Sequence, residues 1–248
     1  MAFLEIDQVT FGYKRETPII TDVSWKINKG EFHSLLGRSG CGKTTLLKLA
    51  SGLLNPVEGA VYLQKKKVVK PSTAVGFVFQ SPTLLEWKNV IDNVLLPITL
   101  QKKPNKEEIN RAEYLLDLVG LSSYRSCYPE ELSGGQQSRV AIARALIKYP
   151  TLLFMDEPFA ALDAITREEL QDDLLRLCQM EKTSVLFVTH DISEAIYLSD
   201  QVALMEAGKI IYNLPVDLPK HRTAEMRYQH SFNELCLNVR QKMSGQEI

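Results

Sequence analysis

The chain has 248 residues, of which 45% are hydrophobic and 24% are charged, which is the composition of an ordinary globular protein. This length suits one large domain, or a core domain that carries a sizeable inserted lobe. The formal net charge is −1, which excludes the sustained positive field that a nucleic-acid-binding protein needs. The basic run Lys65–Lys67 is predicted to be a solvated turn after a short strand.

Cysteine spacing and hydropathy predict a cytosolic protein, or one that docks on a membrane component. The cysteines lie far apart and form no CxxC pair, so they indicate neither a zinc site nor a disulfide framework. Residues 1–7 lack the basic flank and apolar stretch of a signal peptide. Apolar segments such as residues 93–100 are far shorter than the ~20 residues that span a bilayer. The cysteines are Cys41, Cys127, Cys178 and Cys236.

Predicted strands and helices alternate along most of the chain. Short apolar runs predict buried strands at residues 30–36, 74–79, 151–155 and 184–189. Helical periodicity is found at residues 43–50, 106–119, 134–148 and 164–180. This alternation predicts an α/β fold with a parallel sheet, whose ligand binds at the carboxyl ends of the strands.

The alternation breaks between about residues 80 and 150, where we expect no strand. Asn105 and Glu108 make a capping-box pattern, and Gly120 is a suitable helix stop. We therefore predict a helical lobe inserted into an α/β core. The predicted domains are a core at residues 1–80 and 150–215, the lobe at 81–149 and a short helical extension at 216–248.

A glycine-rich segment between a predicted strand and a predicted helix has the composition of a phosphate-binding loop. Residues 37–44 read GRSGCGKT and match the pattern G-x-x-x-x-G-K-[ST]. Such glycines let backbone N–H groups wrap around phosphate oxygens, and the helix start adds partial positive charge. We expect Lys43 to bridge the β- and γ-phosphates of ATP and the Thr44 hydroxyl to bind Mg²⁺. The predicted nucleotide-binding residues of this loop are Gly37, Arg38, Ser39, Gly40, Cys41, Gly42, Lys43, Thr44 and Thr45.

Two alternatives stay open at this loop. A flexible glycine turn before a helix has a similar composition. Cys41 either has its thiol pKa lowered by the helix N-terminus, or is simply a small residue that fits the loop.

Two adjacent carboxylates, Asp156 and Glu157, follow the apolar strand predicted at residues 151–155. Because parallel strands end at one edge of a sheet, we expect these carboxylates to lie beside the phosphate-binding loop. Asp156 would help to hold Mg²⁺, directly or through water. Glu157 would polarise the attacking water as a general base. A general base typically raises the reaction rate by about 10²–10⁴-fold. The alternative for such a pair is a solvated loop or a helix cap.

The third chemical element is the pentapeptide LSGGQ at residues 132–136. Ser133 and Gln136 form a capping-box pattern at a predicted helix start, which presents N–H groups to an anion. This segment lies between the phosphate-binding loop and the strand that carries Asp156, and here the chain resembles the ABC ATPase family. The resemblance implies that the segment contacts the γ-phosphate of a nucleotide held by another subunit. The residues concerned are Ser133, Gly134, Gly135 and Gln136.

Four single residues also resemble functional positions of that family. Tyr13 looks like the aromatic residue that stacks on adenine, although an aromatic near a strand end is otherwise a core residue. Gln80 resembles the Q-loop glutamine, which contacts Mg²⁺ and links the core to the helical lobe. Asp163 resembles the D-loop aspartate, which signals across the dimer. His190 resembles the switch histidine, which contacts the γ-phosphate and the attacking water, the alternative being a surface or capping residue.

The resemblance covers nearly the whole chain. It implies the ABC ATPase fold, an α/β P-loop NTPase core with an N-terminal antiparallel β portion and an inserted α-helical subdomain. Residues 79–94, 157–167 and 218–220 are typical of the nitrate, sulfonate and taurine importer branch. Glu86 stands where that branch often has proline and Ser138 where glutamine is common, so the transported solute stays open.

The resemblance also implies a mechanism and partners. A head-to-tail dimer of two copies would sandwich two ATP molecules, closing on binding and opening after hydrolysis. The segment after Gln80 would receive a short helix of a transmembrane permease at Leu84, Leu85 and Trp87, unless these side chains pack inside the lobe. A periplasmic or lipid-anchored substrate-binding protein would act through the permease. The ATPase itself would lie on the cytoplasmic side of the membrane and bind no nucleic acid.

Three other functions share parts of this pattern. An exporter ATPase carries every one of these motifs. A soluble ABC ATPase of DNA repair or translation usually has a long coiled-coil insertion or two ATPase units, and this sequence has neither. A module that binds ATP only to change shape would not need both Glu157 and His190.

Overall fold

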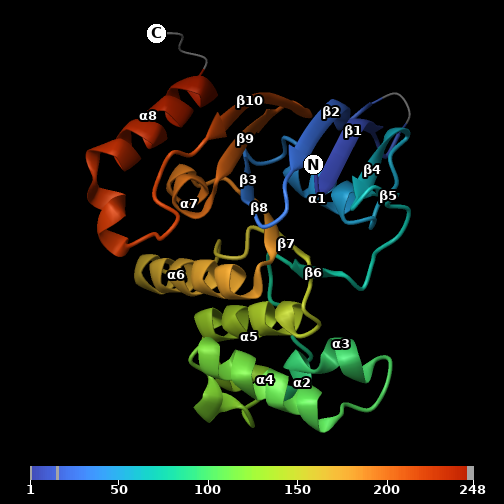
Figure 1. Ribbon diagram of the computed structural model, residues 1–248, viewed down its shortest axis with the longest axis vertical. Helices are drawn as coiled ribbons and strands as arrows, with labels where there is room; N and C mark the ends of the chain where they lie inside the picture. The colour runs from blue at the N-terminus through green and yellow to red at the C-terminus, as the bar shows by residue number, and fades with distance from the viewer. Residues whose placement is uncertain (1, 15–16, 245–248) are drawn as a thin grey trace. The chain divides into compact units, whose positions relative to one another are not determined.

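The structure is a computed structural model that describes residues 2–14 and 17–244 (Figure 1). The chain divides into two compact units, the first made of Met1–Ser72 with Ser184–Ile248 and the second of Thr73–Thr183. Met1 and residues 245–248 of the predicted extension lie outside the described residues. The domain boundaries given above stay a prediction.

The first unit contains an antiparallel sheet in the order β2-β1-β4-β5. Its strands form because buried apolar residues such as Leu4, Ile6 and Val9 recur along one side of β1. The predicted turn at Lys65–Lys67 is partly wrong, because Lys66 and Lys67 form β5 and pair with Leu63 and Tyr62. Gln64 and Lys65, both at positive φ, make the turn alone. The strands are β1 Leu4–Phe11, β2 Ile20–Ile27, β4 Glu58–Leu63 and β5 Lys66–Lys67.

The first unit also contains strands in the order β10-β9-β3-β8. The central strand β3 pairs in parallel with β8 and β9 and is buried along its length, including its polar residues His33 and Ser34. The edge strand β10 is antiparallel to β9, which the helix–strand alternation did not predict. The strands are β3 Phe32–Leu36, β8 Ser184–Thr189, β9 Gln201–Glu206 and β10 Lys209–Pro215.

The helices of the first unit are α1 Lys43–Ala50, α7 Ile192–Leu198, the 3₁₀ turn Ala224–Tyr228 and α8 His230–Ser244. The helix predicted at residues 43–50 is confirmed to the residue. Helix α8 packs on α7, where the rings of Tyr197 and Phe232 meet edge-on with centroids 6.5 Å apart. A helix beyond residue 215 was expected, and α8 is that helix.

The second unit pairs the parallel strands β6 and β7 and is otherwise helical. Every residue from 80 to 150 is described and none of them is in a strand, which confirms the predicted helical stretch. The Asn105–Glu108 capping box is also confirmed, with backbone-to-side-chain hydrogen bonds of 2.9 and 2.8 Å. The elements are β6 Val75–Val78, α2 Val90–Val94, α3 Leu96–Thr99, α4 Lys106–Leu118, the 3₁₀ turns Ser122–Tyr124 and Pro129–Glu131, α5 Gly134–Leu146, β7 Leu152–Asp156 and α6 Ala164–Glu181.

The helices of the second unit are held together by buried charge as well as by apolar packing. Arg111 on α4 donates to Glu181 at the end of α6 at 2.8 Å, and both side chains are largely buried. The Arg111 guanidinium also lies 4.1 Å from the ring centroid of Tyr149. Among the helices of the described residues, none is both long enough and apolar enough to cross a membrane.

Candidate functional site

The predicted phosphate-binding loop joins the buried strand β3 to helix α1 in the first unit (Figure 1). Its turn requires glycine at Gly40 and Gly42, whose φ angles are 81° and 109°. A Cβ atom on Gly42 would also lie 2.9 Å from Cδ1 of Ile20. Helix α1 begins as the Leu46 N–H donates to the Gly42 carbonyl at 2.9 Å. The loop is therefore a shaped turn at a helix start and not merely a flexible glycine linker.

Lys43 is the buried cation of this loop. Its side chain is almost fully buried, and its ammonium donates to the carbonyl oxygens of Gly37 at 2.9 Å and Arg38 at 3.1 Å. The ammonium is therefore held over the loop itself, while Ser39 and Gly40 are exposed. Thr44 and Thr45 follow on the first turn of α1, both half-buried. This arrangement presents a buried ammonium and a hydroxyl at a helix N-terminus, which suits a polyphosphate.

The loop cysteine is not an activated thiol. Cys41 is half-buried, and burial raises the pKa of its thiol above the ordinary value, against the opposing effects of Lys43 and of backbone hydrogen bonds. Of the two alternatives for Cys41, a pKa lowered by the helix N-terminus is therefore wrong. Cys41 is a small residue that fits the loop.

His190 lies at the same edge of the sheet as the phosphate-binding loop. Strands β3 and β8 run parallel with Leu36 opposite Thr189, so the segments that follow these two strands leave the sheet at neighbouring points. His190 is exposed and follows β8 directly. The first unit therefore brings the predicted loop and the predicted switch histidine together.

A small buried network fixes the backbone around His190. The Thr189 hydroxyl donates to Glu194 Oε2 at 2.6 Å and accepts from the Asp191 N–H at 3.0 Å. Asp191 in turn caps α7 by accepting from the Glu194 N–H at 3.1 Å. Thr189 and Glu194 were missed by the sequence analysis, although the D-x-x-E spacing after the strand is itself a capping signal.

Tyr13 lies just beyond β1 in the first unit. Its side chain is 65% exposed, and its ring meets Phe11 edge-on with centroids 5.2 Å apart. The alternative that Tyr13 is a core residue is therefore wrong. An exposed ring held by one neighbour is available for stacking on a planar base.

In the second unit, Gln80, Asp156 and Glu157 lie at one sheet edge. Strands β6 and β7 are parallel with Val78 opposite Met155, so Gln80 and the two carboxylates follow neighbouring strand ends. Asp156 is buried and Glu157 is half-buried. Glu157 adopts a φ of 45°, an uncommon backbone conformation for a residue other than glycine, and such strain clusters at functional sites.

The LSGGQ segment of the second unit is a capped helix start, as predicted. The Gln136 N–H donates to Ser133 Oγ at 3.3 Å, and the Ser133 N–H donates to Gln136 Oε1 at 2.9 Å. Gly134 has open space where a Cβ atom would stand, but a Cβ atom on Gly135 would lie 2.5 Å from Cγ2 of Thr166. Thr166 is on the first turn of α6 and donates its N–H to Asp163 at 3.0 Å. The signature segment and the predicted D-loop aspartate are thus neighbours.

Asp163 is an N-cap residue with a stabilised charge. Its pKa is lowered by the backbone and side-chain hydrogen bonds from Thr166. It therefore stays ionised and holds the start of α6 in place.

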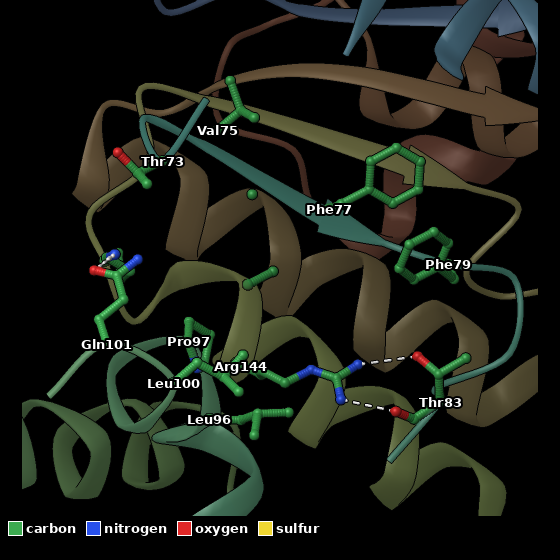
Figure 2. A pocket seen from close by; sticks show the side chains of 13 residues that line it. Thr73, Val75, Phe77, Phe79, Thr83, Leu96, Pro97, Leu100, Gln101 and Arg144 are labelled. Atoms are coloured by element: carbon green, nitrogen blue, oxygen red, sulfur yellow. Dashed lines mark hydrogen bonds between the residues drawn. The ribbon is translucent and has the colours of Figure 1, made fainter. Parts of the chain in front are cut away.

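The second unit also contains a cavity of about 480 Å³ between β6, α3 and α5, which we call the β6 cavity (Figure 2). Figure 2 shows Phe77 and Phe79 on one side and Leu96, Pro97 and Leu100 on another. Most of its wall is apolar, and Arg144 and Lys148 also line it. Phe79 and Leu100 are exposed large hydrophobic residues, so the cavity opens to solvent.

The chain segment beside this cavity is rigidly held. Arg144 donates to the Thr83 carbonyl at 2.9 Å and to the Thr83 hydroxyl at 3.2 Å (Figure 2). It also donates to the Pro82 carbonyl at 2.6 Å. Asn93, fully buried, accepts from the Leu85 N–H at 2.8 Å and donates to the carbonyls of Leu85 and Lys88. The roles of Arg144 and Asn93 were missed, because their partners lie in an irregular loop.

The segment pinned by Arg144 and Asn93 carries the three apolar side chains expected to meet a partner. Trp87 is 74% exposed, whereas Leu84 and Leu85 are half-buried. The alternative that these side chains pack inside the lobe is therefore wrong for Trp87. It is partly correct for Leu84 and Leu85.

Comparison with known proteins gives consistent results. The family described as "ABC transporter" matches residues 20–160. The aliphatic sulfonates import ATP-binding protein SsuB of Bacillus cereus is 38% identical over 244 residues, covering 96% of this chain and 95% of SsuB. The nitrate import ATP-binding protein NrtD of Synechococcus elongatus is 42% identical over 212 residues, covering 83% of this chain and 77% of NrtD.

Solved structures agree with the fold. The ATP-binding cassette MJ0796, in a dimeric post-hydrolysis state with ADP and Pi, superposes with a TM-score of 0.76 at 31% identity. The match covers 87% of this chain and 100% of that one. The expected combination of an antiparallel β portion, a parallel P-loop sheet and helices is therefore confirmed.

Proposed function

We propose that this chain, which belongs to the family of ABC transporter ATP-binding proteins, energises the import of a small oxyanionic solute. The chain is the ATP-binding and ATP-hydrolysing subunit of an ABC importer. The observation that carries this conclusion is the similarity to import ATP-binding proteins along nearly the full length, together with an unbroken set of predicted catalytic residues.

In the proposed site, the loop from Gly37 to Thr45 wraps the phosphates and Tyr13 stacks on the adenine. Lys43 neutralises charge on the β- and γ-phosphates, since its buried ammonium already lies over the loop. Glu157 acts as general base toward water, and His190 contacts the γ-phosphate. Phosphoryl transfer to water depends mainly on such positioning and charge stabilisation.

The residues suited to Mg²⁺ are Thr44, Gln80 and Asp156. Hydroxyl, amide and carboxylate oxygens are the donors that this hard cation prefers, and Asp156 is a buried carboxylate at the end of a strand. The fit therefore rests on the chemistry of the donor set. When bound, Mg²⁺ would neutralise charge on the β- and γ-phosphate oxygens.

We propose that two copies form a head-to-tail dimer. The MJ0796 cassette is dimeric with ADP and Pi bound, which supports the dimer, and the head-to-tail orientation is our proposal. In such a dimer, Ser133, Gly134, Gly135 and Gln136 of one copy would complete the nucleotide site of the other. Asp163, beside the signature helix, would report the state of one site to the partner.

We propose the β6 cavity and the adjoining Trp87 as the docking site for a short permease helix. A largely apolar cavity suits the apolar face of an amphipathic helix, and the pinned loop that contributes Thr83 to its wall also carries the exposed Trp87. Such docking would hold the ATPase at the cytoplasmic face of the membrane. The named relatives import sulfonates and nitrate, so we propose a sulfonate, taurine, nitrate or similar solute, delivered by a substrate-binding protein through the permease.

Affinity purification of the chain from membranes of its own cells tests this function. We expect a transmembrane permease to copurify, and Leu100→Asp together with Trp87→Asp to reduce its yield at least about tenfold, because burying an unpaired carboxylate opposes docking. Met180→Asp, at a residue 53% exposed on α6, is the matched control and should leave the yield unchanged. Copurification with cytosolic proteins alone would contradict the importer assignment.

A further inference from the structure

We propose that a second cavity, between the switch segment and helix α8, binds a small organic oxyanion whose binding regulates ATP turnover. The cavity has a volume of about 600 Å³ and belongs entirely to the first unit. One wall is His190–Ser193, and the other is the face of α8 that carries Cys236 and Arg240. We call it the α8 cavity, and its role is additional to the ATPase function proposed above.

The walls of the α8 cavity are built from packed residues. Phe232 and Val239 are buried and hold α8 against the rest of the unit. The Arg227 guanidinium stacks at 3.4 Å from the ring centroid of Tyr197, and Tyr197 is itself fully buried. The cavity is thus a feature of the folded unit, within the size range of small-molecule sites.

The charges of this cavity favour an anion. Arg227 and Arg240 both line it, and guanidinium groups match the oxygen pairs of carboxylates and phosphates. Its one acidic lining residue, Asp191, already accepts the hydrogen bond that caps α7. Phe232 and Leu237 add apolar surface beside the cations. The ligand class is therefore a small molecule with an oxyanion at one end and an apolar portion.

Helix α8 also contacts the phosphate-binding loop, so a ligand in the cavity could affect ATP turnover through this helix. The Arg38 guanidinium donates to the Met243 carbonyl at 3.4 Å, and Met243 lines a smaller hollow together with Arg38 and Cys41. The C-terminal end of α8 therefore contacts the phosphate-binding loop, and the middle of α8 lines the same cavity as His190. A ligand that prefers one position of α8 would shift the switch histidine and the loop together.

Protection of Cys236 from alkylation tests binding at the cavity itself. The purified chain, saturated with ADP to occupy the phosphate-binding loop, is treated with N-ethylmaleimide with or without ethanesulfonate, propionate or inorganic phosphate. Burial raises the pKa of the Cys236 thiol to about 11, so its labelling is slow enough to follow by peptide mass spectrometry. We expect at least one probe to slow labelling of Cys236 about tenfold and to leave Cys127 unaffected.

Two charge variants on α8 provide the matched comparison. Arg240→Gln should abolish protection, whereas Lys242→Gln, which removes a cation facing Tyr212, should retain it. No protection by any probe, or equal protection in Arg240→Gln, would overturn the proposed site. This readout needs no turnover, so a chain that shows protection but no ATPase activity would contradict the ATPase function and not the cavity.

Measuring phosphate release tests whether binding at the α8 cavity regulates ATP turnover. With a protecting probe present, we expect the ATPase rate of the wild-type chain to change at least about twofold, and that of Arg240→Gln to stay at its basal value. A rate that does not respond to a probe shown to protect Cys236 would overturn the regulatory claim.

Discussion

Replacing Glu157 by Gln is expected to lower ATP turnover by about 10²–10⁴-fold while leaving ATP binding intact. The substitution keeps the shape of the side chain but removes the carboxylate that would accept a proton from the attacking water. Glu157 directly follows β7 and has a φ of 45°, an uncommon backbone conformation that clusters at functional sites. In the proposed head-to-tail dimer, ATP binding would close the two copies and hydrolysis would open them, so the variant should accumulate as a closed dimer.

Phosphate release and size-exclusion chromatography with ATP measure the two parts of this prediction. Glu169→Gln is the matched control, since Glu169 is an exposed carboxylate on α6, and its rate should equal that of the wild type. A normal ATPase rate in Glu157→Gln would remove Glu157 as the base.

Replacing Lys43 by Ala is expected to weaken ATP binding by at least about tenfold and to abolish turnover, because hydrogen bonds to a charged group contribute about 1.5–3 kcal/mol. The Lys43 ammonium is buried over the loop carbonyls, whereas Arg38, the other cation of the loop, is exposed and its guanidinium donates to Met243. Titration with a fluorescent ATP analogue measures the affinity.

Lys48→Ala provides the control for Lys43, because Lys48 is a cation in the last turn of the same helix. Its affinity for the analogue should stay within about twofold of the wild type, since charge effects at helix ends are small. Unchanged affinity in Lys43→Ala would reject the phosphate-binding assignment.

The features that the sequence predicted best are those with local signals. Helix α1 begins at Lys43 and the capping boxes of Asn105 and Ser133 form as expected, because their partners lie three residues away. The largely apolar sequences of β3, β7 and β8 likewise need no partner to be recognised, since buried parallel strands are rich in apolar residues.

The features that were missed depend on partners distant in sequence. The Arg38–Met243 hydrogen bond joins residues 205 positions apart, and Arg144 holds carbonyls some 60 positions earlier. The β5 pairing of Lys66 and Lys67 also had no signal, because exposed lysines are typical of turns. The strained φ of Glu157 and the raised pKa of Cys41 arise only from the folded surroundings.

The central claim is that each ATP is hydrolysed by residues of two copies of this chain. Mixing two inactive variants tests it most directly: Lys43→Ala has an intact signature segment, and Ser133→Arg has an intact phosphate-binding loop. In a symmetric head-to-tail dimer the mixture forms one complete site in half of the dimers, so phosphate release should return to about a quarter of the wild-type rate. Release no greater than the sum of the two separate variants would contradict the composite site.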